Sequence, residues 1–116
     1  MPRAATTTDV FNAIAEPRRR QIIETLARRG SLAVGALVGA VGLPQPAVSK
    51  HLAVLREVGV VSVHKSGRQR VYRLNAQELK SVYDWARAFE PFWSHQLDRI
   101  KQRAEEKARA RTDAST

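Results

Sequence analysis

The residues best suited to chemistry are polar and basic side chains gathered in the middle of the chain. Gln45, Ser49, Lys50 and His51 stand within seven positions of one another, and the segment KSGRQR at residues 65–70 adds three basic side chains. A glutamine can pair with two atoms of adenine, a lysine can donate to the acceptors of guanine, and both Lys and Arg neutralise phosphates. These residue types predict recognition of nucleic acid.

The net charge points to the same class of partner. Twenty Lys and Arg face eleven Asp and Glu in 116 residues, for a formal net charge of +9. The densest unbalanced part is residues 60–75, with four bases and no acid, and residues 1–30 carry a further net +3. Basic small proteins most often meet nucleic acid or an anionic membrane surface. A role of the charge in solubility alone is the alternative.

Several other function classes find no support in the sequence. The chain has no cysteine, which excludes disulfides, Cys-ligated zinc and thiolate nucleophiles. Its three histidines are widely spaced and no nucleophile–base pair is visible, so we expect no enzyme and no cofactor. No apolar run could cross a membrane, and MPRAATTTDV lacks the apolar core of a signal peptide. We therefore expect a cytoplasmic protein with no membrane partner.

Three short helices are expected to precede the polar segment. The first is capped by Thr8 or Asp9 and runs through Ile14. The second begins at Pro17 and ends at Gly30. The third runs from Leu32 to Val41 and is ended by Gly42. The first residues, 1–8, are small and polar and are expected to form a disordered arm.

The polar segment itself predicts a helix with one buried face. Val48, Leu52, Leu55 and Val58 recur at helical spacing, and Gly59 ends the pattern. The first turn of this helix carries the polar and basic side chains on its other face. A short helix, a turn and a second helix that opens in this way are typical of a helix-turn-helix.

A β-hairpin is expected to follow. Residues 60–64 alternate as a strand does, Lys65-Ser66-Gly67-Arg68 is typical of a turn, and residues 69–74 form the return strand. A final long helix then runs from about Asn75 or Ala76 to about Arg103, with Pro91 predicting a kink or two helices that abut near Glu90.

Over residues 9–105 the chain resembles the ArsR/SmtB-type winged helix-turn-helix repressors. The resemblance is carried by FNAIAEPRRRQIIETL, LPQPAVSKHLAVLREVGVV, HKSGRQRVYRL and WARAFEPFWSHQLDRI. The aromatic C-terminal stretch and AEPRRR further resemble the SdpR-like branch, whose members often repress their own operons without a metal. The resemblance implies a mainly helical α+β fold ordered as four helices, two strands and a fifth helix. It also implies a homodimer joined by its first and last helices.

The expected domain limits follow from this resemblance. A winged helix-turn-helix domain spans 9–105 and includes a dimerisation helix at about 76–105, between the arm at 1–8 and a frayed charged tail at 106–116.

The predicted DNA contacts fall into two sets. Those of the recognition helix are Gln45, Pro46, Ala47, Ser49, Lys50 and His51. Those of the wing and the phosphate backbone are Lys65, Ser66, Arg68, Gln69, Arg70, Arg18 and Arg19. Arg68 is the first choice for insertion into a narrow minor groove. Because each helical residue turns by about 100°, Arg18, Arg19 and Arg20 cannot all face DNA, and one is expected to pair with Glu16 or Glu24.

Metal sensing, known in the family, has weak support here. Ala33 and Gly35 stand where one family site has two cysteines in a pattern like ELCVCDL. Asp84, His95 and Asp98 match part of a second family site, but its first ligand falls on Val82, which cannot bind metal. A solvated or paired histidine is the simpler interpretation, so no metal is expected.

Apolar residues of the first and last helices are predicted to form the dimer interface. They are Val10, Phe11, Ile14, Val82, Trp85, Phe89, Phe92, Trp93 and Leu97. A small-molecule pocket at this interface is the alternative for the aromatic residues.

The sequence thus predicts a sequence-specific DNA-binding repressor that acts as a homodimer on an imperfect inverted repeat at a promoter, in an autoregulatory manner. One alternative is a repressor that responds to a metal or small molecule through its C-terminal helix. The others are a non-specific architectural DNA-binding protein and a winged helix that docks another protein.

Overall fold

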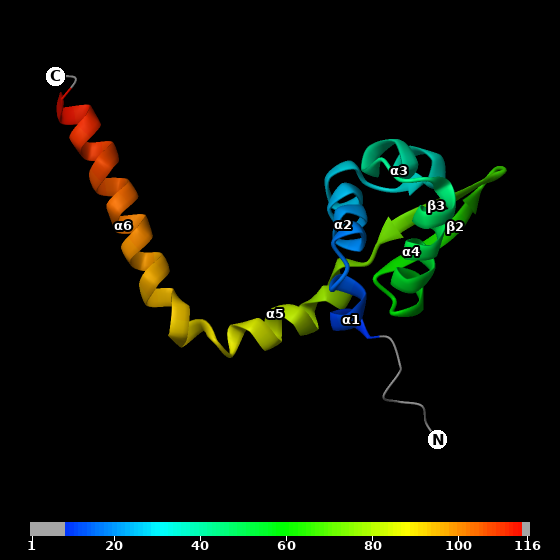
Figure 1. Ribbon diagram of the computed structural model, residues 1–116, viewed down its shortest axis with the longest axis horizontal. Helices are drawn as coiled ribbons and strands as arrows, with labels where there is room; N and C mark the ends of the chain where they lie inside the picture. Colours follow the sequence, from blue (N-terminus) through cyan, green and yellow to red (C-terminus); the bar gives the residue numbers. More distant parts are fainter. Residues whose placement is uncertain (1–8, 115–116) are drawn as a thin grey trace. The chain divides into compact units, whose positions relative to one another are not determined.

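The computed structural model describes residues 9–114, which form two compact units, one ending at Val82 and one starting at Tyr83. The arm predicted for residues 1–8 lies outside the described residues. The elements are α1 (Val10–Ile14), α2 (Pro17–Arg29), β1 (Leu32–Ala33), α3 (Val34–Val41), α4 (Gln45–Glu57), β2 (Val61–Ser66), β3 (Gln69–Leu74), the 3-10 helix η2 (Ala76–Leu79), α5 (Lys80–Arg87) and α6 (Glu90–Ala114) (Figure 1). The predicted mainly helical α+β class and the winged helix-turn-helix order are confirmed.

The first unit is built around one core, which α2, α3 and α4 form with the base of the hairpin. Its buried apolar side chains are Ala13, Ile22, Ile23, Leu26, Leu37, Val41, Val48, Leu52, Leu55, Val60 and Val61. These are largely the residues that recur at helical spacing in the sequence. Burial of this face fixes which side of α4 is left for solvent.

The predicted helix ends are confirmed by their caps. The Asp9 carboxylate accepts a hydrogen bond from the Asn12 backbone N–H at 2.8 Å, and Pro17 lies in the first turn of α2. Gly30 and Gly42 end α2 and α3 with φ angles of 85° and 69°, in the region that favours glycine.

The third helix begins later than predicted. Leu32 and Ala33 form the short strand β1, which pairs antiparallel with Tyr72 and Val71 of β3. The sheet therefore has three strands in the order β1-β3-β2, not two. The backbone hydrogen bonds that Leu32 and Ala33 form with β3 stabilise a strand more than their helical spacing in the sequence favours a helix.

The hairpin turn is shorter than predicted. Ser66 pairs with Gln69 and Lys65 with Arg70, so only Gly67 and Arg68 form the turn. Gly67 has a φ of 64° and no described non-Gly residue has a positive φ, as expected for a type II′ turn. The hairpin extends beyond α4 of the same unit, with this turn at its free end (Figure 1).

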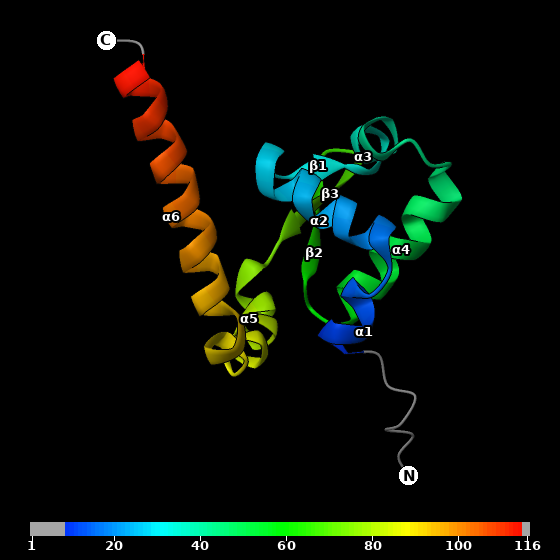
Figure 2. The ribbon, with the colours of Figure 1, turned by 60° about the vertical axis from the view of Figure 1, so that its left-hand side comes forward.

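The predicted long final helix is interrupted, as Pro91 indicated. α5 ends at Arg87 and α6 begins at Glu90, so that Pro91 occupies the first turn of α6. Figure 2 shows the bend between them. α6 continues to Ala114, past the end expected near Arg103, through a stretch rich in Ala, Glu, Lys and Arg, which are good helix formers. None of the helices in residues 9–114 is long and apolar enough to span a membrane.

Candidate nucleic-acid interface

The side chains of α4 point in four directions, one toward the core and three away from it. Val48, Leu52 and Leu55 are at most 1% exposed and hold the helix against the core. At about 100° per residue, Gln45 and Ser49 lie on the flank that faces the hairpin. His51 lies on the opposite flank, beside α2, and Lys50 points directly away from the core.

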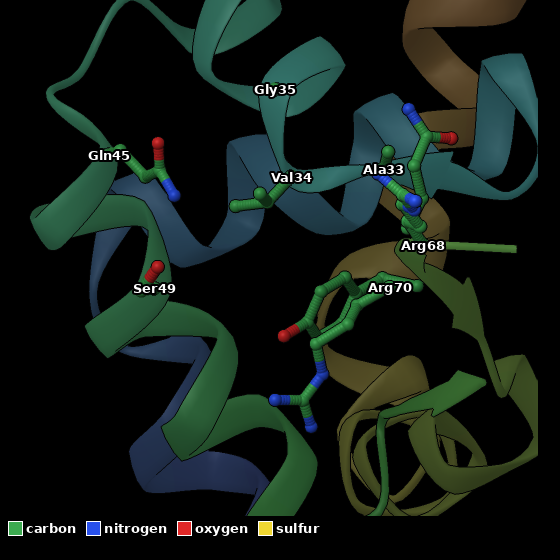
Figure 3. Close-up of a pocket in the computed structure, with 9 residues that line it drawn as sticks. Ala33, Val34, Gly35, Gln45, Ser49, Arg68 and Arg70 are labelled. Carbon is green, nitrogen blue, oxygen red and sulfur yellow. The ribbon is translucent and has the colours of Figure 1, made fainter. Parts of the chain in front are cut away.

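A groove of about 530 Å³ separates α4 from the hairpin. Gln45 and Ser49 line it from α4, Arg68 and Arg70 from the hairpin, and Val34 from the start of α3. Figure 3 shows the Gln45 side chain near Val34 and the Arg70 guanidinium turned toward α4. The remaining lining residues are Ala33, Gly35, Gln69 and Tyr72. The groove thus joins two arginines with amide and hydroxyl groups over an apolar floor.

The groove side of the hairpin carries positive charges directly opposite one another. Arg70 shares a face of the sheet with Tyr72, since residues two apart on a strand point the same way. Lys65 is the cross-strand partner of Arg70, so two like charges are adjacent, with Arg68 just beyond them in the turn. Like charges at this position destabilise a hairpin, and an anion in the groove would offset the repulsion.

The three arginines at the start of α2 have different surroundings. The Arg19 guanidinium donates to the backbone carbonyl of Ala13 at 2.5 Å, and Arg20 donates to that of Ile14 at 2.6 Å. The side chain of Arg18 contacts Gln21 at 3.1 Å and lies on the surface. The expected internal partner was Glu16 or Glu24, but Arg19 and Arg20 use the carbonyls at the end of α1 instead. A short helix leaves these carbonyls without intrahelical donors, and the Glu16 carboxylate caps α2 by accepting from the Arg18 backbone N–H.

The structure brings together only some of the predicted DNA contacts. Gln45, Ser49, Arg68, Gln69 and Arg70 share the groove, whereas the other eight lie outside it: Pro46, Ala47, Lys50, His51, Lys65, Ser66, Arg18 and Arg19. All remain predictions as DNA contacts. The floor of the groove, formed by Ala33, Val34 and Tyr72, has no local signal in the sequence, because the pairing of β1 with β3 is what brings Ala33 and the start of α3 beside Tyr72.

The predicted interface residues divide between the two units. In the first unit, Val10 and Ile14 pack against the core, while Phe11 is exposed. In the second unit, Trp85 and Phe89 form an edge-to-face pair with ring centroids 5.0 Å apart, and both are exposed. Phe92, Trp93 and Leu97 are exposed as well, whereas Val82, the last residue of the first unit, is half-buried. Within the described part of the second unit, the large apolar side chains therefore form no core of their own.

Among residues 9–114 no three His, Asp or Glu side chains come together as metal ligands. Asp84, His95 and Asp98 thus form no such group within one chain. The two positions at which the family pattern has cysteines, Ala33 and Gly35, line the groove instead.

Known proteins resemble this chain in sequence and fold. The family of bacterial regulatory proteins described as the arsR family matches residues 16–63. The transcriptional repressor SdpR of Bacillus subtilis is 32% identical over 77 residues, which cover 66% of this chain and 84% of that protein. The HTH-type transcriptional regulator NmtR of Mycobacterium tuberculosis is 39% identical over 83 residues, 72% of this chain and 68% of that protein. The crystal structure of a possible transcriptional regulator for arsenical resistance superposes with a TM-score of 0.63 at 36% identity, covering 81% of this chain and 94% of that one.

Proposed function

We propose that this chain, which belongs to the arsR family of bacterial regulatory proteins, represses transcription as a homodimer. The dimer would bind an imperfect inverted repeat at a promoter, including the promoter of its own gene. Its family makes it a DNA-binding transcriptional repressor and not an enzyme. The homodimer, the inverted repeat and the autoregulation are the steps that we add.

The groove between α4 and the hairpin is the observation that carries the proposal. Its two arginines, with Lys65 opposite Arg70, supply the positive charge that a sugar-phosphate backbone requires. With a DNA strand in this groove, the first turn of α4 enters the major groove and the turn at Gly67-Arg68 approaches the adjacent minor groove. Gln45 is then placed to pair with an adenine, and Arg68 to insert where the minor groove is narrow.

Two copies of α4 are needed to read an inverted repeat. The exposed apolar side chains of the second unit offer a surface that a second copy would cover. Phe11, exposed on the first unit, is a further predicted interface residue. The two recognition helices would then bind successive major grooves about one helical turn apart. We propose the cytoplasm as the location, because promoter DNA is there.

We also propose that DNA binding does not depend on a metal. The chain has no cysteine and no described group of three His, Asp or Glu ligands, so a metal would need ligands from both subunits. Repression would then be relieved by dilution, by a partner or by a small molecule.

Footprinting of the purified full chain on its own upstream region tests the proposal. We expect protection of an imperfect inverted repeat, unchanged by added zinc. Equal protection along the whole fragment would instead indicate an architectural protein, and loss of protection with zinc would indicate a metal-responsive repressor. If salt has no effect on DNA affinity, the hairpin serves protein docking, because neutralised phosphates must release counterions.

A further inference from the structure

His51 differs from the other polar residues in the first turns of α4 because its side chain contacts a residue of α2. A terminal nitrogen of the Arg19 guanidinium lies 3.4 Å from Nδ1 of the imidazole. The same guanidinium donates from Nε to the Ala13 carbonyl at 2.5 Å and from its other terminal nitrogen toward the Asn12 carbonyl at 3.5 Å. All three nitrogens of this planar group are thus engaged, which fixes the direction in which the third one points.

The chemistry of the two groups fixes the direction of the hydrogen bond. A guanidinium has five N–H donors and no acceptor, so Nδ1 of His51 must accept. A neutral imidazole carries one proton, which therefore sits on Nε2. Arg19 thus selects one of the two tautomers of His51.

The protonated nitrogen is the one that remains available to a ligand. Within residues 9–114, Nε2 of His51 has no hydrogen-bond partner, and no side-chain polar atom is both buried and without a partner. Nε2 is therefore open to solvent. It lies on the recognition helix, one turn after Ala47 and next to Lys50, which points away from the core.

We propose that Arg19 is a positioning residue that makes His51 a hydrogen-bond donor, through Nε2, to an acceptor atom of a base in the major groove. The acceptors there are N7 of either purine, O6 of guanine and O4 of thymine. The amino groups of adenine and cytosine are donors, so this arrangement rejects them. The proposal rests on the proposed function, because it requires α4 to lie in the major groove.

Nuclear magnetic resonance of the full chain, labelled with 15N at histidine, tests the tautomer without DNA. Long-range 1H–15N correlations, recorded at rising pH until the ring signals no longer change, show which ring nitrogen of the neutral imidazole carries the proton. The His51 signals are identified by their loss in His51→Gln. We expect the Nε2–H form in the wild-type chain and a mixture of both forms in Arg19→Met.

Arg20→Met is the matched control, because Arg20 also donates to the end of α1, whereas in the described part of the chain the hydrogen bond to His51 comes from Arg19. It is expected to keep the Nε2–H form, and thermal melting of both variants checks that each is folded. The Nδ1–H form in the wild-type chain would overturn the proposal, as would an equal change in the two variants.

DNA binding then tests the consequence, with single base-pair changes across the half-site found by footprinting. We expect the wild-type chain to discriminate at one position that Arg19→Met and His51→Ala no longer distinguish. Arg19→Met should bind the operator about tenfold more weakly and a scrambled duplex about equally well, and Arg20→Met should resemble the wild type. A wild-type chain without preference for the operator would refute the proposed function itself. A wild-type chain with that preference, alongside an Arg19→Met variant that behaves as Arg20→Met does, would refute this inference alone.

Discussion

Arg70 and Arg73 are three residues apart on β3, and the pleat of the strand directs them to opposite faces of the hairpin. Arg70 lines the groove beside α4, whereas Arg73 is paired with Ser62 on the other face. The two arginines carry the same charge on the same strand, so they separate the effect of position from that of net charge. Only the first is placed to neutralise a phosphate in the groove.

We therefore expect Arg70→Ala to reduce the slope of log affinity against log salt by about one, because one fewer phosphate is neutralised. Arg73→Ala removes the same charge and should leave the slope nearly unchanged. Fluorescence anisotropy with a labelled operator across a salt series measures both. Equal slopes for the two variants would place the DNA elsewhere on the hairpin.

Gln45 and Arg68 line the same groove but are predicted to contribute differently to recognition. Gln45→Ala should relax the preference at one position in each half-site, since a bidentate contact with a base contributes about 1–3 kcal/mol of discrimination. Arg68→Ala should weaken binding to operator and scrambled duplexes by a similar factor, because a minor-groove arginine senses mainly groove width and potential. Competition binding with base-substituted operators distinguishes the two, and an unchanged preference in Gln45→Ala would contradict its role.

At the scale of elements, local signals in the sequence account for the helices better than for the sheet. Asp9, Pro17 and Gly42 mark helix ends through contacts within a few residues, and the structure confirms each of them. The strand β1 has no such signal, because its two residues become a strand only by pairing with Tyr72 and Val71, about forty residues later. The groove depends on this pairing, so the sequence could indicate its charged residues but not its floor.

Two glycines allow the local energetics to be tested in opposite directions. Gly67 forms the hairpin turn at a φ of 64°, whereas Gly39 lies inside α3 with open space around the position of an added Cβ. Gly67→Ala should lower the free energy of unfolding by about 1 kcal/mol or more, since L residues are strained at that φ. Gly39→Ala should raise it by about 0.5–1 kcal/mol, because alanine favours a helix.

Urea denaturation followed by circular dichroism measures the free energy of unfolding of both glycine variants. The Gly39→Ala variant also serves as the control for DNA binding, because Gly39 does not line the groove. A stabilising effect of Gly67→Ala would contradict the type II′ turn, and with it the position of Arg68 at the tip.

At the scale of the whole molecule, the net charge of +9 and the exposed apolar residues have separate consequences. The largest unbalanced part of the charge lies in residues 60–75, which we propose to bind phosphates, while α4 itself adds little net charge. The core of the first unit is formed by residues up to Leu79, and the large apolar residues of the second unit are exposed. The sequence predicted both features. The second chain that we propose as the partner of the apolar surface could not be read from the fold of one chain.

Leu97 provides the sharpest test of that partner. It is 51% exposed on α6, one turn from Trp93 and close to Ile100 on the same stripe. Leu97→Asp would place a charge in the centre of the proposed dimer interface, where it is costly to bury. Gln102→Asp adds the same charge to the same helix, about 140° around it from Leu97, and therefore controls for repulsion between protein and DNA.

We expect sedimentation equilibrium to show a dimer for the wild-type chain and for Gln102→Asp, and a monomer for Leu97→Asp. The monomer should bind a single half-site as the wild type does but lose the added affinity for the full inverted repeat, because the second recognition helix is no longer held at one turn of DNA from the first. A dimeric Leu97→Asp would place the interface on another surface. A monomeric wild-type chain that still protects an inverted repeat would mean that two chains associate only on DNA.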